Sequence, residues 1–158
     1  MSRGYKIPDE PEPSAVSHFT ADVHWIVTAG MIGGNWLAAP WFAFNAYAVG
    51  SATRRREYAL ALALPVTTML VGMALRAAVL HFQWPSRVVA YGALVVFALK
   101  FTLLYELQRR QAVSVGVHTY LGRKKLNGAA LVAAGYLLRS VVIQAAFGVS
   151  PWLGWAVI

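Results

Sequence analysis

Four apolar stretches, each long enough to cross a lipid bilayer, constrain the fold of this chain more than any other feature. A transmembrane helix needs about 20 mostly apolar residues. The stretches cover roughly residues 24–49, 58–82, 86–107 and 126–147. We therefore predict an all-α membrane protein, with a four-helix transmembrane bundle at 23–158 and a polar, proline-rich acidic tail at 1–22.

The composition supports this class and excludes others. Hydrophobic residues make up 58% of the chain and charged residues only 13%, far from the soluble average. Lys and Arg outnumber Asp and Glu by 14 to 6, but they cluster beside apolar runs, which argues against a nucleic-acid-binding surface. The absence of cysteine excludes disulfides and thiolate ligands within the chain.

The basic clusters predict an orientation in the membrane. They lie in the connection between the first two stretches, at 54–56, and in the connection between the last two, at 109–110 and 123–125. The positive-inside rule places both connections in the cytoplasm and both termini outside. We expect a multi-pass protein of a bacterial-type inner (plasma) membrane. Residues 152–158 are too short for another span and either follow Pro151 along the interface or continue the fourth helix.

The chain also carries an internal repeat. Two matched segments and a basic triplet between them occur in the same order in each half. The pairs are 45–50 with 111–116, 54–56 with 123–125, and 72–81 with 135–144. We predict two similar hairpins, at about 24–82 and 86–147, related by a pseudo-two-fold axis along the membrane normal.

Each predicted hairpin places one arginine inside an apolar run. Arg76 follows Gly72, and Arg139 follows Gly135, by about one helical turn, so a neighbouring helix can approach each guanidinium closely. An ionisable residue at membrane depth indicates a functional site. With the predicted orientation, both arginines lie in the outer half of the membrane.

Polar residues at the same predicted side complete a candidate ligand-binding site with the two arginines. They are Asp22, His24, His81 and Gln144. No carboxylate lies within the second or fourth span, so positive charge is left over, and it predicts an anionic ligand. That ligand would be a phosphate lipid, a polyprenyl phosphate or a small anion. Alternatively, both side chains extend to lipid phosphates at the surface, or an acid on another subunit pairs with them.

Small residues in the first span predict close helix packing. Gly30 and Gly34 form a pair that serves either contacts within one bundle or a dimerisation face. Lys100, in the third span, either extends to the inner surface or faces the interior as a buried cation.

Enzymatic and metal chemistry are not predicted. The histidines occur without a second pair that would complete a metal site, and no haem ligand motif repeats in the second half. No paired carboxylates or Ser-His-acid arrangement lies at membrane depth. We expect no metal, no cofactor and no catalytic residue.

Two functions follow from these patterns. In the first, a small polytopic and oligomeric protein binds or transports an anionic ligand at the arginine pair. In the second, a non-catalytic accessory subunit docks into a larger membrane complex through its glycine face and its tail. In both, the expected partners are membrane lipid and either further copies of the chain or other subunits, and not nucleic acid.

Overall fold

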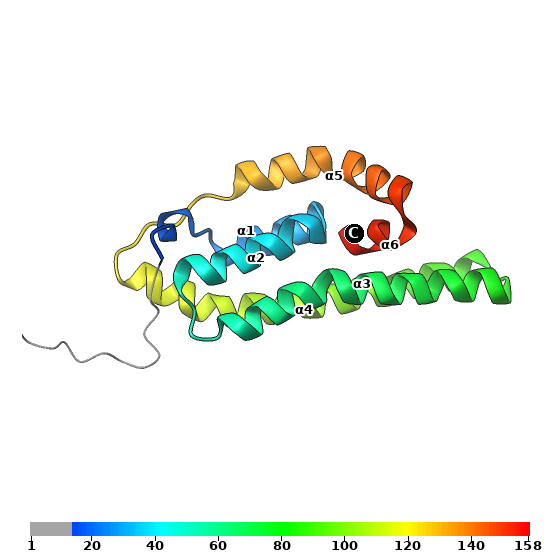
Figure 1. The fold of residues 1–158 in the computed structure, drawn as a ribbon, viewed down its shortest axis with the longest axis horizontal. Coiled ribbons are helices and arrows are strands. Elements are labelled where there is room, and N and C mark those ends of the chain that lie inside the picture. The colour runs from blue at the N-terminus through cyan, green and yellow to red at the C-terminus, as the bar shows by residue number, and fades with distance from the viewer. Residues whose placement is uncertain (1–13) are drawn as a thin grey trace, which may run out of the picture.

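The computed structural model of the protein describes residues 14–158, which form helices joined by short connections (Figure 1). Helices α3 and α4 form a long antiparallel pair, and α1 and α2 lie between this pair and α5 (Figure 1). The elements in chain order are η1 (Ser17–Phe19), α1 (Val23–Ile32), α2 (Asn35–Val49), α3 (Arg54–Phe82), α4 (Ser86–Tyr120), α5 (Ala129–Val149) and α6 (Pro151–Val157).

Three helices are long and apolar enough to cross a membrane, so the fold is that of an all-helical membrane protein. They are α3, residues Ala90–Tyr120 of α4, and α5, with 29, 31 and 21 residues. Large apolar side chains such as Leu70, Leu94 and Leu137 lie exposed on them. Lipid can cover this apolar surface, whereas its exposure to water would be energetically unfavourable. The predicted four spans are not confirmed.

The predicted first span, 24–49, was wrong as a single helix. The helix ends at Ile32, and the chain reverses direction at Gly33 and Gly34. Gly34 has a φ of 115°, a backbone conformation that favours glycine. Helices α1 and α2 have 10 and 15 residues. At a rise of about 1.5 Å per residue, they are about 15 and 22 Å long, shorter than a hydrocarbon core of about 30 Å.

The two short helices form a hairpin that enters and leaves at the same end of the molecule (Figure 1). The base of this hairpin is closed by Asn45, near the end of α2. Its Oδ1 accepts from the backbone N–H of Ala21 at 3.0 Å, and its Nδ2 donates to the Ala21 carbonyl at 3.1 Å. The start of α1 is thereby fixed beside the end of α2.

The described part of the predicted 1–22 tail lies at this same end, together with both basic connections. The N–H of Ser14 donates to the Ala48 carbonyl at 3.1 Å, and the N–H of Leu126 donates to the Thr20 carbonyl at 2.8 Å. We call this end of the molecule the basic end, after residues 54–56 and 123–125. The rest of the predicted tail, at 1–13, lies outside the described residues.

The predicted repeat of two hairpins is not confirmed. The first unit, 24–82, contains α1, α2 and α3, whereas the second, 86–147, contains the 35-residue helix α4 and most of α5. The break at Gly33 and Gly34 has no counterpart in the second unit. The corresponding residues there, Leu99 and Lys100, lie inside the continuous helix α4, because neither provides the conformational freedom of glycine.

The C-terminal segment folds back as a separate helix. Ser150 is extended, with φ −164° and ψ 138°, and α6 then packs against both α5 and α3. Trp155 lies against Gly72 of α3, and its ring makes an edge contact with Phe147 at a centroid distance of 6.1 Å. The fourth span therefore does not continue to the C-terminus.

The contact between Gly72 and Trp155 is testable by adding one methyl group. A Cβ on Gly72 would overlap the rigid indole, so Gly72→Ala should destabilise the protein by about 1–3 kcal/mol. Gly148→Ala is the matched control, because no other atom lies within 4 Å of its Cβ position and alanine favours a helix. Unfolding in mild detergent, followed by circular dichroism, measures both. Equal stability of the two variants would contradict the packing of α6.

Candidate functional site

A buried polar junction lies where the tip of the α1–α2 hairpin meets α3 and α6. Asn35, the first residue of α2, is fully buried. Its Nδ2 donates to Thr68 Oγ1 at 2.9 Å and to the Ala156 carbonyl at 3.4 Å. Its Oδ1 has no hydrogen-bond partner. The N-terminus of α2 is therefore enclosed by other helices of the chain.

Lys100 adds a buried cation to this junction. Only 3% of the residue is exposed, and Nζ donates to the main-chain oxygen of Ile158, just after α6. The side chain therefore points to the interior and not along α4 to the inner surface. Arg139 of α5 lies near enough for its positive charge to act on Lys100.

Arg139 also lines an open cavity of about 540 Å³ on α5. Its lining surface is mostly apolar, with Arg139, Ser140 and Gln144 as the polar groups, and Gln144 belongs to the predicted site. The lining residues are Tyr136, Leu137, Arg139, Ser140, Ile143 and Gln144. Arg76 is exposed on α3 and does not line this cavity, so the two arginines do not share it.

The remaining predicted site residues lie elsewhere. Asp22 caps α1 at the basic end, and its Oδ2 accepts from Lys125 Nζ at 2.6 Å. His24 is exposed beside it, with Nδ1 3.1 Å from Gln108 Nε2. His81 is exposed in the last turn of α3, where its ring contacts Phe82. The six predicted ligand residues therefore do not form one site.

The four glycines predicted to mediate helix packing are all buried within the chain. A Cβ on Gly30 would lie 2.9 Å from Leu104 Cδ2 of α4, and Gly34 lies against the main chain of Val157. Gly135 faces Leu37 of α2, and Gly72 faces Trp155, as described above. These positions bring helices of this chain close together.

The carboxylates explain which cations are compensated. Between residues 14 and 158 the acidic side chains are Asp22, Glu57 and Glu106. Asp22 pairs with Lys125, and Glu106 accepts from Arg109 and Arg110. None of these three acids lines the Arg139 cavity or bonds to Lys100.

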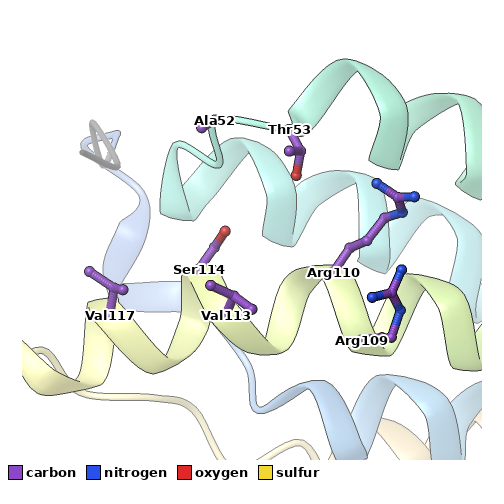
Figure 2. Close-up of a pocket in the computed structure, with 7 residues that line it drawn as sticks. All are labelled: Ala52, Thr53, Arg109, Arg110, Val113, Ser114 and Val117. Atoms are coloured by element: carbon purple, nitrogen blue, oxygen red, sulfur yellow. The ribbon is translucent and has the colours of Figure 1, made fainter. Parts of the chain in front are cut away.

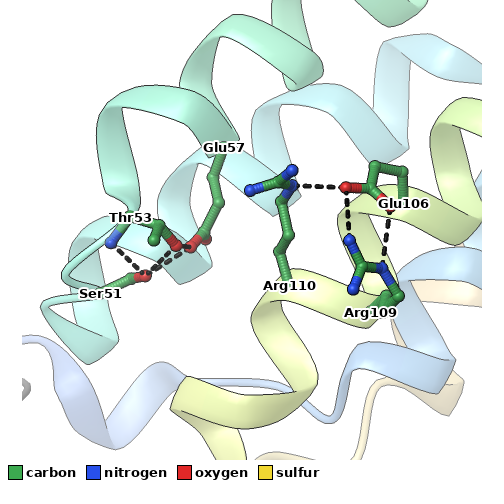
Figure 3. A network of polar contacts seen from close by, with 6 residues as sticks. All are labelled: Ser51, Thr53, Glu57, Glu106, Arg109 and Arg110. Carbon is green, nitrogen blue, oxygen red and sulfur yellow. Dashed lines mark hydrogen bonds and ion pairs between the residues drawn. The ribbon is translucent and has the colours of Figure 1, made fainter.

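The sequence did not predict the network around Glu57 at the basic end (Figure 3). Glu57 is fully buried in the first turn of α3. Its Oε1 accepts from Ser51 Oγ and, at 2.7 Å, from Thr53 Oγ1, and Ser114 of α4 donates to Ser51 at 3.2 Å. An acid one turn after hydroxyl residues at a helix start resembles a capping pattern, which is the signal that was available.

A cavity of about 470 Å³ opens beside this network (Figure 2). Figure 3 shows the Arg110 side chain reaching across from α4 between Glu57 and Glu106. Arg110 Nε and Arg109 Nε donate to the Glu106 carboxylate at 2.7 and 2.9 Å, so their charge is partly neutralised. The lining residues are Ala52, Thr53, Arg109, Arg110, Val113, Ser114 and Val117. The network serves chiefly to hold the α2–α3 connection on α4.

The described residues include no group of three His, Cys, Asp or Glu side chains that could hold a metal ion. Comparison with protein-family models, curated proteins and solved structures found no match.

The ion pair of Asp22 predicts a pH dependence of stability. Burial alone would raise the pKa of Asp22, but hydrogen bonds from Lys125 and from the His24 N–H, with the charge of Lys125, hold this pKa below its usual value. Because the folded pKa is the lower one, the stabilisation is present above the unfolded value of about 3.9 and is lost as the pH falls through the folded value.

Unfolding of the wild type and of Asp22→Asn, compared between about pH 6 and about pH 3, measures this contribution. Asparagine keeps the cap of α1 but not the charge. The wild type should lose about 0.5–1 kcal/mol more than the variant, a small value because both partners are 31% exposed. Parallel curves would contradict the ion pair.

The hydroxyl contact to Glu57 gives a second stability prediction. Thr53→Ala removes one of the donors to a buried carboxylate, so it should destabilise the protein by about 1–2 kcal/mol. Thr119→Ala is the matched control, because its hydroxyl bonds only to the Val115 carbonyl of its own helix. Denaturant unfolding compares the two variants. A loss in Thr119→Ala as large as in Thr53→Ala would refute a specific role for the network.

Proposed function

We propose that this small polytopic membrane protein binds the phosphate headgroup of an anionic amphiphile at the Arg139 cavity. The observation that carries the proposal is Arg139 on an apolar spanning helix, with a hydroxyl and an amide beside it and no described acidic side chain in its cavity. The ligand class is a phosphate lipid or a polyprenyl phosphate, and the protein acts by binding or transporting it, without a catalytic residue or a cofactor.

An unpaired charge is unfavourable in the low dielectric of a membrane. An uncompensated cation at membrane depth costs several kcal/mol unless water or an anion accompanies it. Lys100 has the Ile158 oxygen as its partner, whereas Arg139 has no described acid beside it. A phosphate group would compensate Arg139 through two parallel N–H donors of the guanidinium.

The lining of the cavity favours an amphiphile over a small anion. Ser140 and Gln144 offer a hydroxyl and an amide beside Arg139, and Tyr136, Leu137 and Ile143 supply apolar surface for an acyl or prenyl chain. The cavity lies on a helix with little coverage by the rest of the chain, so a lipid can enter it sideways.

The position of Arg139 favours transport. The residue lies ten positions into α5, which is about 15 Å along the helix axis from its start. A headgroup bound half-way along a spanning helix is on a path between the two leaflets. The neighbouring hairpin tip and α6 provide the discontinuous helices that transporters use for such paths.

We propose that the basic end faces the cytoplasm of a bacterial-type inner membrane. This orientation places residues 14–22 on the cytoplasmic side, because they are bonded to residues 48 and 126. It replaces the earlier prediction that both termini lie outside, which depended on 24–49 crossing the membrane once.

The alternative is a non-catalytic accessory subunit of a larger membrane complex. The glycine face does not favour this alternative, since Gly30 and Gly34 pack within the chain. The exposed apolar side of α5, with Leu131, Leu138 and Val141, offers a surface for another subunit. The ligand-binding function is supported better because it accounts for the polar residues of the cavity.

Substitutions of Arg139 test the proposal. Arg139→Gln should reduce the phosphate lipid that remains bound after purification by about tenfold, because charge-assisted hydrogen bonds are lost. Arg139→Lys should retain part of the binding, since an ammonium supplies charge without the planar fork. Native mass spectrometry of protein released from detergent micelles, with phosphatidylglycerol added, measures the bound fraction.

Arg76→Gln is the matched control for this experiment. It removes the same charge from an exposed position on another spanning helix and should leave lipid binding within about twofold. Unchanged lipid binding in Arg139→Gln, or an equal loss in both variants, would refute a specific site at Arg139.

A further inference from the structure

A second cavity of about 340 Å³ lies at the basic end, where the segment before α1 meets the end of α4. Among the described residues, every polar side chain that lines it can donate a hydrogen bond, and none is a carboxylate. The lining residues are Ser17, His18, His118, Arg123 and Lys124. They come from η1, from the last turn of α4 and from the connection that follows it.

His118 makes this cavity different from a patch of surface charge. Only 2% of His118 is exposed, and neither ring nitrogen forms a hydrogen bond of good geometry with a described residue, although the main chain of Lys124 lies close to the ring. A buried polar group without a partner costs about 1–3 kcal/mol. The imidazole lines the cavity, so a ligand there could provide the missing hydrogen bond.

The main chain around the cavity is already satisfied and does not compete for a ligand. The N–H groups of Leu121, Gly122 and Arg123 close the end of α4 by donating to the carbonyls of Val117, Thr119 and His118. The side chains of Arg123 and Lys124 remain exposed beside His118. Their charges disfavour a metal cation and favour an anion.

The described groups around the cavity do not neutralise the positive charges of Arg123 and Lys124. Lys125, the next basic residue, forms an ion pair with Asp22, so the carboxylate of Asp22 is engaged with a cation other than Arg123 or Lys124. His18 is oriented by its Nδ1, 3.1 Å from the Ala15 carbonyl, which leaves Nε2 for another partner.

We propose that this cavity is a binding site for a phosphate group, carried by free phosphate or by the headgroup of a cytoplasmic-leaflet lipid. Arg123 and Lys124 supply the charge, and Ser17 and His118 supply hydrogen bonds to the phosphate oxygens. The site lies at the end of α4, on residues separate from the Arg139 cavity, and does not depend on it.

Two probes distinguish the sources of the phosphate group. Equilibrium dialysis of the full-length protein in a neutral detergent, with labelled inorganic phosphate, tests the free anion. Nanodiscs that contain phosphatidic acid, compared with nanodiscs of phosphatidylcholine alone, test a lipid headgroup through the chemical shifts of ¹⁵N-labelled histidine. If neither inorganic phosphate nor phosphatidic acid binds to the protein, the proposal is overturned.

Three variants establish whether the binding is specific. Arg123→Gln and His118→Phe should each weaken binding of the effective probe by about tenfold, as expected for a charge-assisted bond. Arg56→Gln is the control, because it removes an arginine at the same end that lines a different cavity, and it should change binding by less than about twofold. Arg123 is exposed, so its variant retains the fold even if His118→Phe does not.

Variant-dependent binding of inorganic phosphate supports a site for the free anion, and variant-dependent histidine shifts only with phosphatidic acid support a headgroup site. An equal loss in Arg56→Gln and Arg123→Gln would show general attraction to the basic end and would refute the site. Lipid binding by Arg139→Gln, measured separately, does not bear on this result.

Discussion

The chain reversal at Gly33 and Gly34 is the constraint on which most of the structure depends. A backbone turn at membrane depth must have its polar groups satisfied within the protein, since lipid offers no partner. Trp36 Nε1 donates to the Gly33 carbonyl at 2.8 Å, and Asn35 binds Thr68 and the end of α6. Helix α6 therefore folds back to cover the hairpin tip, and Gly72 allows it to lie against α3.

The distribution of charge divides the molecule into two functional regions. At the basic end, lysine, threonine and arginine side chains donate to the carboxylates of Asp22, Glu57 and Glu106. These contacts hold connecting segments and helices together. Along the spanning helices, Lys100 donates to the main-chain oxygen of Ile158, and none of the three described acidic side chains lines the Arg139 cavity. The first arrangement joins opposite charges and hydroxyl donors to these carboxylates, although Glu57 Oε2 has no hydrogen-bond partner among the described residues. For the second, we propose that an anion is the partner of Arg139.

Matching residues of the repeated segments contact each other in the fold, which is a different outcome from the predicted symmetry. Asn45 and Gln111 occupy matching positions in the two halves, and in the fold they meet, with Asn45 Nδ2 3.4 Å from Gln111 Oε1. Gln111 also donates to the Phe42 carbonyl at 2.6 Å and so joins α4 to α2. A match between sequences can indicate residues that contact each other, but it does not specify the path of the chain between them.

Length and hydropathy by themselves determined the membrane class and most of the extent of α3 and α5, predicted at 58–82 and 126–147. They also indicated Arg139 and Gln144, because a polar residue in an apolar run is visible without a structure. Only the tertiary structure decided that 24–49 reverses, that Asp22 meets Lys125, and that Glu57 and His118 are buried. Hydropathy averages over a run and carries no direction, whereas these features depend on hydrogen bonds and packing between residues far apart in the chain.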